Sequence, residues 1–196
     1  MDTVFAILTG AGLGAAAGIR PFLPALVAGA AASADVLIDF DGTDLSFLEQ
    51  TGWLLAVVLA LIGFVLLQRR MTSEGLDRHA LGSALAGLAL GVGALLFAGA
   101  LAEEESTWWP GLVGGLACAA LAQATVRDLL RRTRARLDPE AREALTLYAD
   151  GASLLLAALA ILLPPVSVVA LGALVWLLIS GRRRAGEKFA GLRILR

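Results

Sequence analysis

The stretch TGAGLGAAAGIRPFLPAL, residues 9–26, places an arginine and two prolines inside an apolar segment that runs from Val4 to Ala32. A cation in membrane hydrocarbon costs about 2.5 kcal/mol even on the mildest scale, so such a residue normally faces protein or water. Pro21 cannot donate a backbone hydrogen bond, and it disfavours helical geometry at Arg20. We therefore expect the first helix to be broken at Arg20-Pro21, with a second half-helix starting at Pro21.

The expected break is a candidate anion site. A half-helix N-terminus presents unpaired N–H groups and a partial positive charge, and here the guanidinium of Arg20 lies beside it. On the N-terminal side, Gly10, Gly14 and Gly18 recur every four residues and predict a smooth face for close helix packing. The same spacing at Gly87 and Gly91 predicts a second packing face.

Composition places the whole chain in a membrane. The sequence is 58% hydrophobic and 17% charged with a mean hydropathy of +0.79, values outside the usual range of soluble domains. Cys118 is the one cysteine and His79 the one histidine, which excludes cysteine or histidine metal clusters. We expect no metal or cofactor, and we interpret His79, at a segment boundary, as solvated.

The fold class predicted is all-α, a polytopic transmembrane helix bundle of about six spans in one domain, residues 1–196. Adjacent prolines suit a tight turn, so the last two spans should form a hairpin that turns at Pro164-Pro165. Ser46 and Glu49 have capping-box spacing. The expected spans are residues 4–32, 53–67, 80–102, 109–126, 145–163 and 166–180, with interfacial amphipathic segments at 43–52 and 127–144 and a basic tail at 181–196.

The positions of the basic residues predict the topology. All Lys and Arg except Arg20 lie in residues 69–78, 127–142 and 182–196. Since basic loops stay in the cytoplasm, six spans in the cytoplasmic (inner) membrane would put both termini inside. Six spans also divide into three plus three, which would fit an inverted-topology repeat, and such repeats bind ligands at broken helices near the midplane.

Further polar residues complete the candidate substrate site. Asp150 lies about 8 Å inside the cytoplasmic boundary by helical rise, and it could pair with Arg20, accept protons or cap the bundle. Gln123, inside the fourth span, could bond a neighbouring helix or a substrate. The candidate substrate-binding residues are Gly18, Arg20, Pro21, Gln123, Tyr148 and Asp150.

A basic stretch beside the fourth span predicts contact with anionic lipid headgroups, through Arg127, Arg131, Arg132 and Arg134. Nucleic-acid binding is not expected, because no aromatic residues interleave the arginines.

The leading functional hypothesis is a small transporter or channel for an anionic solute or lipid headgroup. The alternative is a structural or accessory membrane protein that holds lipid or a partner through its cytoplasmic basic regions. An enzyme ranks third, since one histidine, one cysteine and no paired intramembrane acids leave little for catalysis. Glycine-dense faces would also suit a homodimer.

Several of these motifs resemble a bacterial integral membrane family catalogued as domain of unknown function 4126. The resemblance rests on GIRPFLPAL at 18–26, the arginine-rich exit of the fourth span, the Asp150 region and Pro164-Pro165. Arg127 and Arg131 match the family's basic pair and Asp150 its second acid. Ala124, Thr146 and Ala149 replace a histidine, a serine and the first acid. The resemblance implies a multipass fold and no particular activity, and the replacements put family-wide proton chemistry in doubt.

Overall fold

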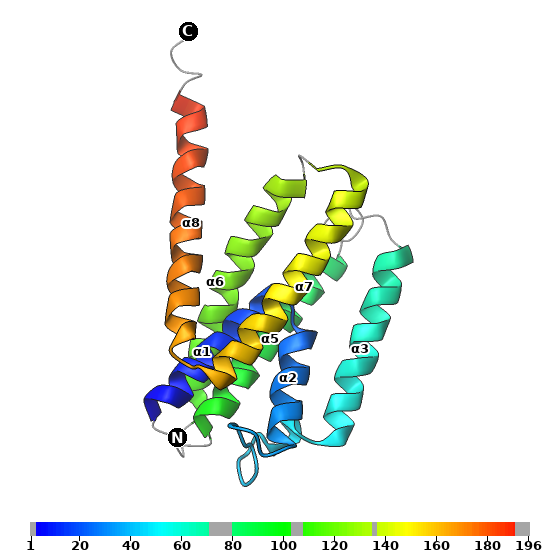
Figure 1. The fold of residues 1–196 in the computed structure, drawn as a ribbon, viewed down its shortest axis with the longest axis vertical. Coiled ribbons are helices and arrows are strands. Elements are labelled where there is room, and N and C mark those ends of the chain that lie inside the picture. Colours follow the sequence, from blue (N-terminus) through cyan, green and yellow to red (C-terminus); the bar gives the residue numbers. More distant parts are fainter. Residues whose placement is uncertain (1–2, 71–79, 103–107, 135–136, 191–196) are drawn as a thin grey trace.

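The structure is a computed structural model that describes residues 3–70, 80–102, 108–134 and 137–190. Within these residues the chain forms seven α-helices, one short 3-10 helix and no strand (Figure 1). This confirms the expected all-helical bundle. The elements are α1 (Thr3–Ile19), α2 (Phe22–Ala32), η1 (Ser46–Leu48), α3 (Thr51–Arg70), α5 (Ala80–Ala102), α6 (Trp109–Arg134), α7 (Pro139–Leu162) and α8 (Val166–Ala190).

The helices have the length and the surface of membrane-embedded elements. Gly82–Ala102, Trp109–Arg134 and Ala144–Leu162 are long and apolar enough to cross a bilayer, and the remaining apolar helices are shorter. Large apolar side chains point outward from the bundle, and Leu147 is 74% exposed. A surface of this kind is stable only against an apolar solvent, so the protein is embedded in a membrane.

The first apolar segment is broken where proline chemistry predicts. α1 ends at Ile19 and α2 begins at Phe22, so the non-helical residues between them are Arg20 and Pro21. The last two helices form the expected hairpin, with turn residues at Pro164-Pro165. Both breaks follow from the same property, since proline interrupts the backbone hydrogen bonds of a helix.

The chain reverses direction at the first break. Gly10 lies against Phe97 and Gly14 against Gly93, so α1 runs antiparallel to α5. After the break, Phe22 stacks with Phe64 while Gly29 lies against Leu54, so α2 runs antiparallel to α3. The start of α1 and the end of α2 therefore lie at the same end of the bundle (Figure 1).

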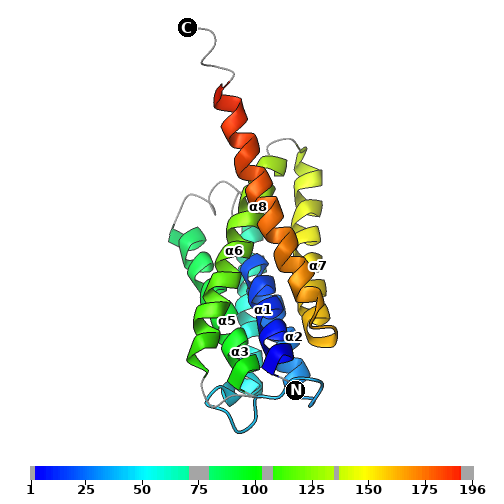
Figure 2. The same cartoon turned by 90° about the vertical axis from the view of Figure 1, so that its left-hand side faces the viewer.

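This reversal corrects the predicted topology. Residues 4–32 form a re-entrant pair of helices that enters the bundle and returns, instead of the first of six crossings. The start of α1 and the end of α8 consequently lie at opposite ends of the bundle (Figures 1 and 2), so the prediction that both termini share one side is wrong. The break has no counterpart in α6, which is continuous from Trp109 to Arg134, and the inverted repeat stays a prediction.

α1 forms the centre of the bundle. Residues 9–18 are all buried, and α1 packs against α5, α6, α7 and α8. Gly10, Gly14 and Gly18 lie in close contact with neighbouring helices, as their spacing predicts. The packing prediction for Gly87 and Gly91 is wrong for the described chain, because no atom lies within 4 Å of a Cβ added at either glycine.

The predicted interfacial segments are parts of other elements. α6 continues to Arg134 and α7 begins at Pro139, so residues 127–134 and 139–144 belong to the ends of two helices. Residues 43–52 form η1, a loop and the start of α3. The loop around η1 closes its end of the bundle by burying Ile38, Phe40 and Leu48. His79 lies outside the described residues, as do the side chains of the basic tail from residue 182.

Candidate functional site

The break between α1 and α2 is held by α7. The amide of Arg20 donates to the carbonyl of Ala16 at 3.1 Å. The hydroxyl of Ser153, on α7, donates to the same carbonyl at 2.9 Å and lies 3.4 Å from the carbonyl of Arg20. Pro21 and Pro24 carry no N–H, so the free first-turn amides of α2 come from Phe22 and Leu23. The Ser153 hydroxyl thus offers a donor to the carbonyl of Arg20, whose helical partner would be the missing N–H of Pro24, and adds a second hydrogen bond to the carbonyl of Ala16.

Arg20 and Asp150 form an ion pair. The Nε of Arg20 lies 2.6 Å from Oδ1 of Asp150, and their side chains are 16% and 39% exposed. Of the interactions that the sequence left open for Asp150, the structure therefore shows the pairing with Arg20.

A cavity of about 180 Å³ lies beside this pair. α2 contributes Phe22 and Leu23, and α3 contributes Leu61, Phe64 and Val65. Phe64 lies about 20 Å along α3 from Thr51, at 1.5 Å per residue, which is about two thirds of the way across the hydrocarbon. The site is therefore an apolar pocket at membrane depth that holds one cation and one anion.

The other predicted substrate-binding residues lie elsewhere. Gln123 donates from Nε2 to the carbonyl of Ala86 at 3.2 Å, so it bonds a neighbouring helix. Tyr148 is 77% exposed on α7 and does not line the cavity. Gly18 packs against the backbone of Ala119 on α6. Arg20, Asp150 and the adjoining Pro21 are the predicted residues that the fold brings together.

The candidate headgroup arginines Arg127, Arg131 and Arg132 bond the protein itself. Arg127 donates to the carbonyl of Gly82 at 3.3 Å, which ties α6 to the start of α5. Arg132 pairs with Asp128 and donates to the carbonyl of Gly181 at 3.2 Å, which ties α6 to α8. The side chain of Arg131 is 82% exposed although it pairs with Asp128 at 3.0 Å, so it remains accessible to headgroups.

Replacing Ser153 with alanine is expected to lower the free energy of unfolding by about 1–2 kcal/mol. The hydroxyl is fully buried, and its loss leaves the carbonyl beside the break without this donor. Thermal unfolding in detergent measures the change. Ser33→Ala is the control, because its hydroxyl bonds the Ala30 carbonyl at an exposed position. Equal effects of the two replacements would show that Ser153 does not hold the break.

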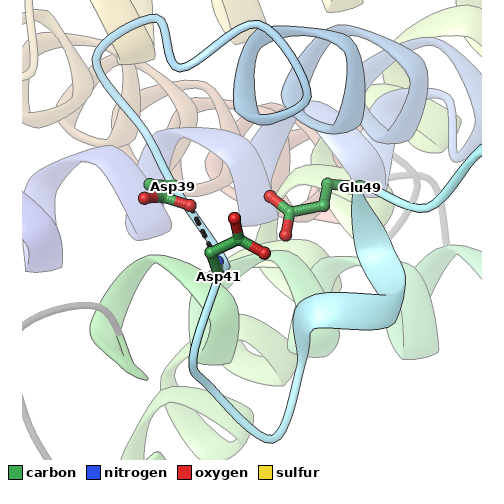
Figure 3. A group of neighbouring side chains, drawn as sticks. All are labelled: Asp39, Asp41 and Glu49. Carbon is green, nitrogen blue, oxygen red and sulfur yellow. Dashed lines mark hydrogen bonds between the residues drawn. The ribbon is translucent and has the colours of Figure 1, made fainter.

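A second polar cluster lies in the loop between α2 and α3. The carboxylates of Asp39, Asp41 and Glu49 lie within 4.8 Å of one another, and Asp41 stands between the other two (Figure 3). Glu49 accepts a hydrogen bond from the amide of Phe40 at 3.2 Å, so the predicted capping box with Ser46 is wrong. Among the described residues this is the group that could hold a metal ion by ligand spacing. This group could not be predicted from the residue spacing, because the folding of the loop brings the three carboxylates together.

Glu49→Gln is expected to stabilise the protein at neutral pH. Burial, together with Asp41 and Asp39, raises the pKa of Glu49 above its ordinary value of 4.5. A raised carboxyl pKa favours the folded state below pH 4.5, and this stability is lost as the pH rises through the folded pKa. Glutamine keeps an acceptor for the Phe40 amide without the charge. We expect the melting temperature to rise by about 1–2 °C at pH 7.

The pH dependence of the melting temperature, recorded with a chelator present, tests this expectation. The gain from Glu49→Gln should shrink below pH 4.5. The control is Asp35→Asn, which removes an exposed acid of the same loop from outside the cluster. The expectation would be contradicted if Glu49→Gln and Asp35→Asn raised the melting temperature equally at pH 7. It would also be contradicted if the rise from Glu49→Gln persisted below pH 4.5.

The fold and the site define the class of this protein. It is a helical membrane protein with an ion pair at the break of a re-entrant helix. A family model described as Domain of unknown function (DUF4126) matches residues 7–184, and the chain belongs to this family. No curated protein and no solved structure shows a significant match to the chain.

Proposed function

We propose that the protein is a small transporter or channel for an anionic solute or lipid headgroup, recognised by Arg20. The observation that carries the proposal is a paired cation that lines a cavity. The Nε of Arg20 lies 2.6 Å from Asp150, and both side chains line a cavity at membrane depth. An ionisable residue kept inside a membrane bundle is costly, and it is usually retained for a ligand or an ion path.

Asp150 would act as the internal competitor of the anion. With the site empty, its carboxylate neutralises Arg20 and makes the buried cation tolerable. An arriving oxyanion would accept hydrogen bonds from the terminal guanidinium nitrogens, an arrangement that suits carboxylate and phosphate groups. The free first-turn amides of α2, from Phe22 and Leu23, adjoin the same cavity and would add donors. The proposal assigns no catalytic step to these residues.

The orientation we propose follows the basic residues. The ends of α3, α6 and α8 that adjoin the basic stretches lie at one end of the bundle (Figure 1). By the positive-inside rule that end faces the cytoplasm, in the inner membrane. The re-entrant pair would then enter from the outer side, and Arg20 would lie in the cytoplasmic half of the bilayer.

The alternative is a structural or accessory protein, and it is favoured by arginines whose side chains bond other parts of the bundle. Arg127 and Arg132 bond helix carbonyls, and Arg20 is already paired. In that case the ion pair would only stabilise the break. The two functions differ in one property, namely whether an anion reaches Arg20.

Thermal stability of the purified protein against a panel of anions and phospholipid headgroups tests the proposal, followed by flux assays in liposomes. A ligand that binds only the folded state raises the melting temperature. At a ligand concentration one hundred times the dissociation constant, it adds about 2.7 kcal/mol to the free energy of unfolding. The matched variant is the double replacement Arg20→Gln with Asp150→Asn, which removes both charges together and leaves no unpaired one. Stabilisation of the parent that is lost in this folded variant supports the proposal. Absence of stabilisation and flux for every anion would favour the structural alternative.

A further inference from the structure

The volume of the cavity limits what it can enclose. About 180 Å³ corresponds to roughly six water molecules at their liquid volume. Pockets that enclose a whole small-molecule ligand usually measure about 300–1,000 Å³. The cavity therefore accommodates a group of the size of a phosphate, and the rest of a larger ligand would have to lie outside it.

The walls of the cavity are unsuited to a hydrated ion. Apart from Arg20 and Asp150, every lining residue is apolar, and these residues are Phe22, Leu23, Leu61, Phe64 and Val65. A free anion would lose its hydration shell against these walls and regain hydrogen bonds from one side only. A ligand with an anionic head and a hydrocarbon tail would instead bury its tail against such walls, which is favourable.

The surroundings of Asp150 show that the cavity opens toward lipid. Leu147 and Leu154 lie three residues before and four residues after Asp150, on the same face of α7. They are 74% and 44% exposed, and the Asp150 side chain between them is itself 39% exposed. On α3, Val65 lines the cavity and is 39% exposed. The residues around the opening are therefore those of a lipid-facing surface.

The packing of α3 leaves room for sideways access. α3 packs mainly against α2, with a smaller contact to η1, and α2 separates it from α7 (Figure 1). The cavity lies where α2 begins, with walls from α3 on one side and Asp150 of α7 on the other. A molecule in the bilayer could reach Arg20 between these two helices without passing through the centre of the bundle, which α1 fills.

We propose that the anion is the phosphate of a membrane lipid, which reaches Arg20 sideways between α3 and α7 while its acyl chains remain in the bilayer. This inference rests on the proposed function, and it narrows the substrate class from anions in general to phosphate-bearing amphiphiles. The head binds the guanidinium, and the first tail carbons contact the apolar walls.

The test compares three probes on the detergent-purified full chain by thermal shift. Dioctanoyl phosphatidic acid has the phosphate and the tails, glycerol 3-phosphate has only the phosphate head, and dioctanoylglycerol has only the tails. The expected result is stabilisation by the phosphatidic acid at a concentration about tenfold or more below that of glycerol 3-phosphate, because each buried methylene adds several-fold in affinity. Dioctanoylglycerol should not stabilise the protein.

A pair of matched variants locates the binding. Val65→Trp fills the opening, whereas Val58→Trp makes the same change seven residues earlier on α3, at a position 36% exposed that does not line the cavity. Stabilisation by phosphatidic acid should be lost in the first variant and kept in the second. It should also be lost in the double replacement of Arg20 and Asp150 described above.

Each contrary outcome has a distinct meaning. If glycerol 3-phosphate or inorganic phosphate stabilises the protein as well as phosphatidic acid does, and the double variant loses all of these effects, the anion site is supported. The inference of sideways lipid access is then overturned. Phosphatidic acid that stabilises the double variant or Val65→Trp as much as the parent would show general lipid binding and overturn the inference. Failure of every phosphate probe would overturn the inference, whereas the proposed function fails only if the wider panel of anions described above also gives no stabilisation and no flux.

Discussion

Arg20→Gln and Asp150→Asn are each expected to destabilise the protein more than the double replacement does. Each single change leaves an unpaired charge at membrane depth, whereas the double change leaves two neutral amides. Breaking a fully buried pair costs about 3–5 kcal/mol, and the partial exposure of Asp150 lowers our expectation to about 2–3 kcal/mol. The melting temperature in detergent should then fall by about 5–10 °C in each single variant and recover in the double variant.

An exposed arginine provides the control for this cycle. Arg131 pairs with Asp128 at 3.0 Å, but its side chain is 82% exposed, so Arg131→Gln should change the stability by less than about 1 kcal/mol. If the effects of Arg20→Gln and Asp150→Asn simply add in the double variant, the two residues do not interact energetically. The ion pair would then contribute nothing to holding the re-entrant helix.

Gly18→Ala is expected to lower the free energy of unfolding by about 3 kcal/mol, the upper end of what overpacking costs. A Cβ at this position would overlap the carbonyl oxygen of Ala119 and lie 2.8 Å from its Cα, and backbone atoms cannot move aside as a flexible side chain can. Because Gly18 is near the end of α1, the displacement would also disturb Arg20. Both the melting temperature and any anion-induced shift should decrease.

Gly87→Ala is the matched control for this prediction. It lies inside α5, where nothing is within 4 Å of an added Cβ, so alanine should stabilise the helix by about 0.5–1 kcal/mol. We expect Gly18→Ala to lower the free energy of unfolding and Gly87→Ala to raise it. A similar loss at both positions would mean that another surface, such as a second copy of the chain, covers Gly87.

Proline chemistry made the breaks of the fold predictable, but it did not show their direction. Residue types place the interruptions at Arg20-Pro21 and Pro164-Pro165, because proline disrupts helices wherever it occurs. The turn at the second break reverses the chain, as expected. At the first break, the sequence is equally compatible with a kinked crossing and with a reversal, and residues 4–32 have the length of a span either way. The charge rule could not decide, since no basic residue flanks this segment.

The candidate site was predictable only for residues whose chemistry is exceptional in a membrane. Arg20 and Asp150 stand out because an ionisable group in hydrocarbon needs a partner. Tyr148 and Gln123 could not be placed, because helices that are apolar all round give no periodic signal for their inward face. The exposure of Tyr148 and the bond from Gln123 to Ala86 follow from helix rotation, which packing sets. The packing predicted from small-residue spacing was likewise wrong at Gly87. Such spacing indicates a smooth helix face, but it does not show that a neighbouring helix lies against that face.

The enclosure of α1 imposes an order on biosynthesis. α1 is synthesised before the helices that surround it, which begin with α5 at Ala80 and end with α8. Ser153, which bonds the break, follows Arg20 by 133 residues, or roughly 7–27 s at about 5–20 residues per second. Until then the arginine has neither its carboxylate nor the surrounding protein, so the N-terminal hairpin reaches its final position only after the C-terminal helices are in the membrane. A helix that is synthesised before its neighbours is thus the last to acquire its final contacts.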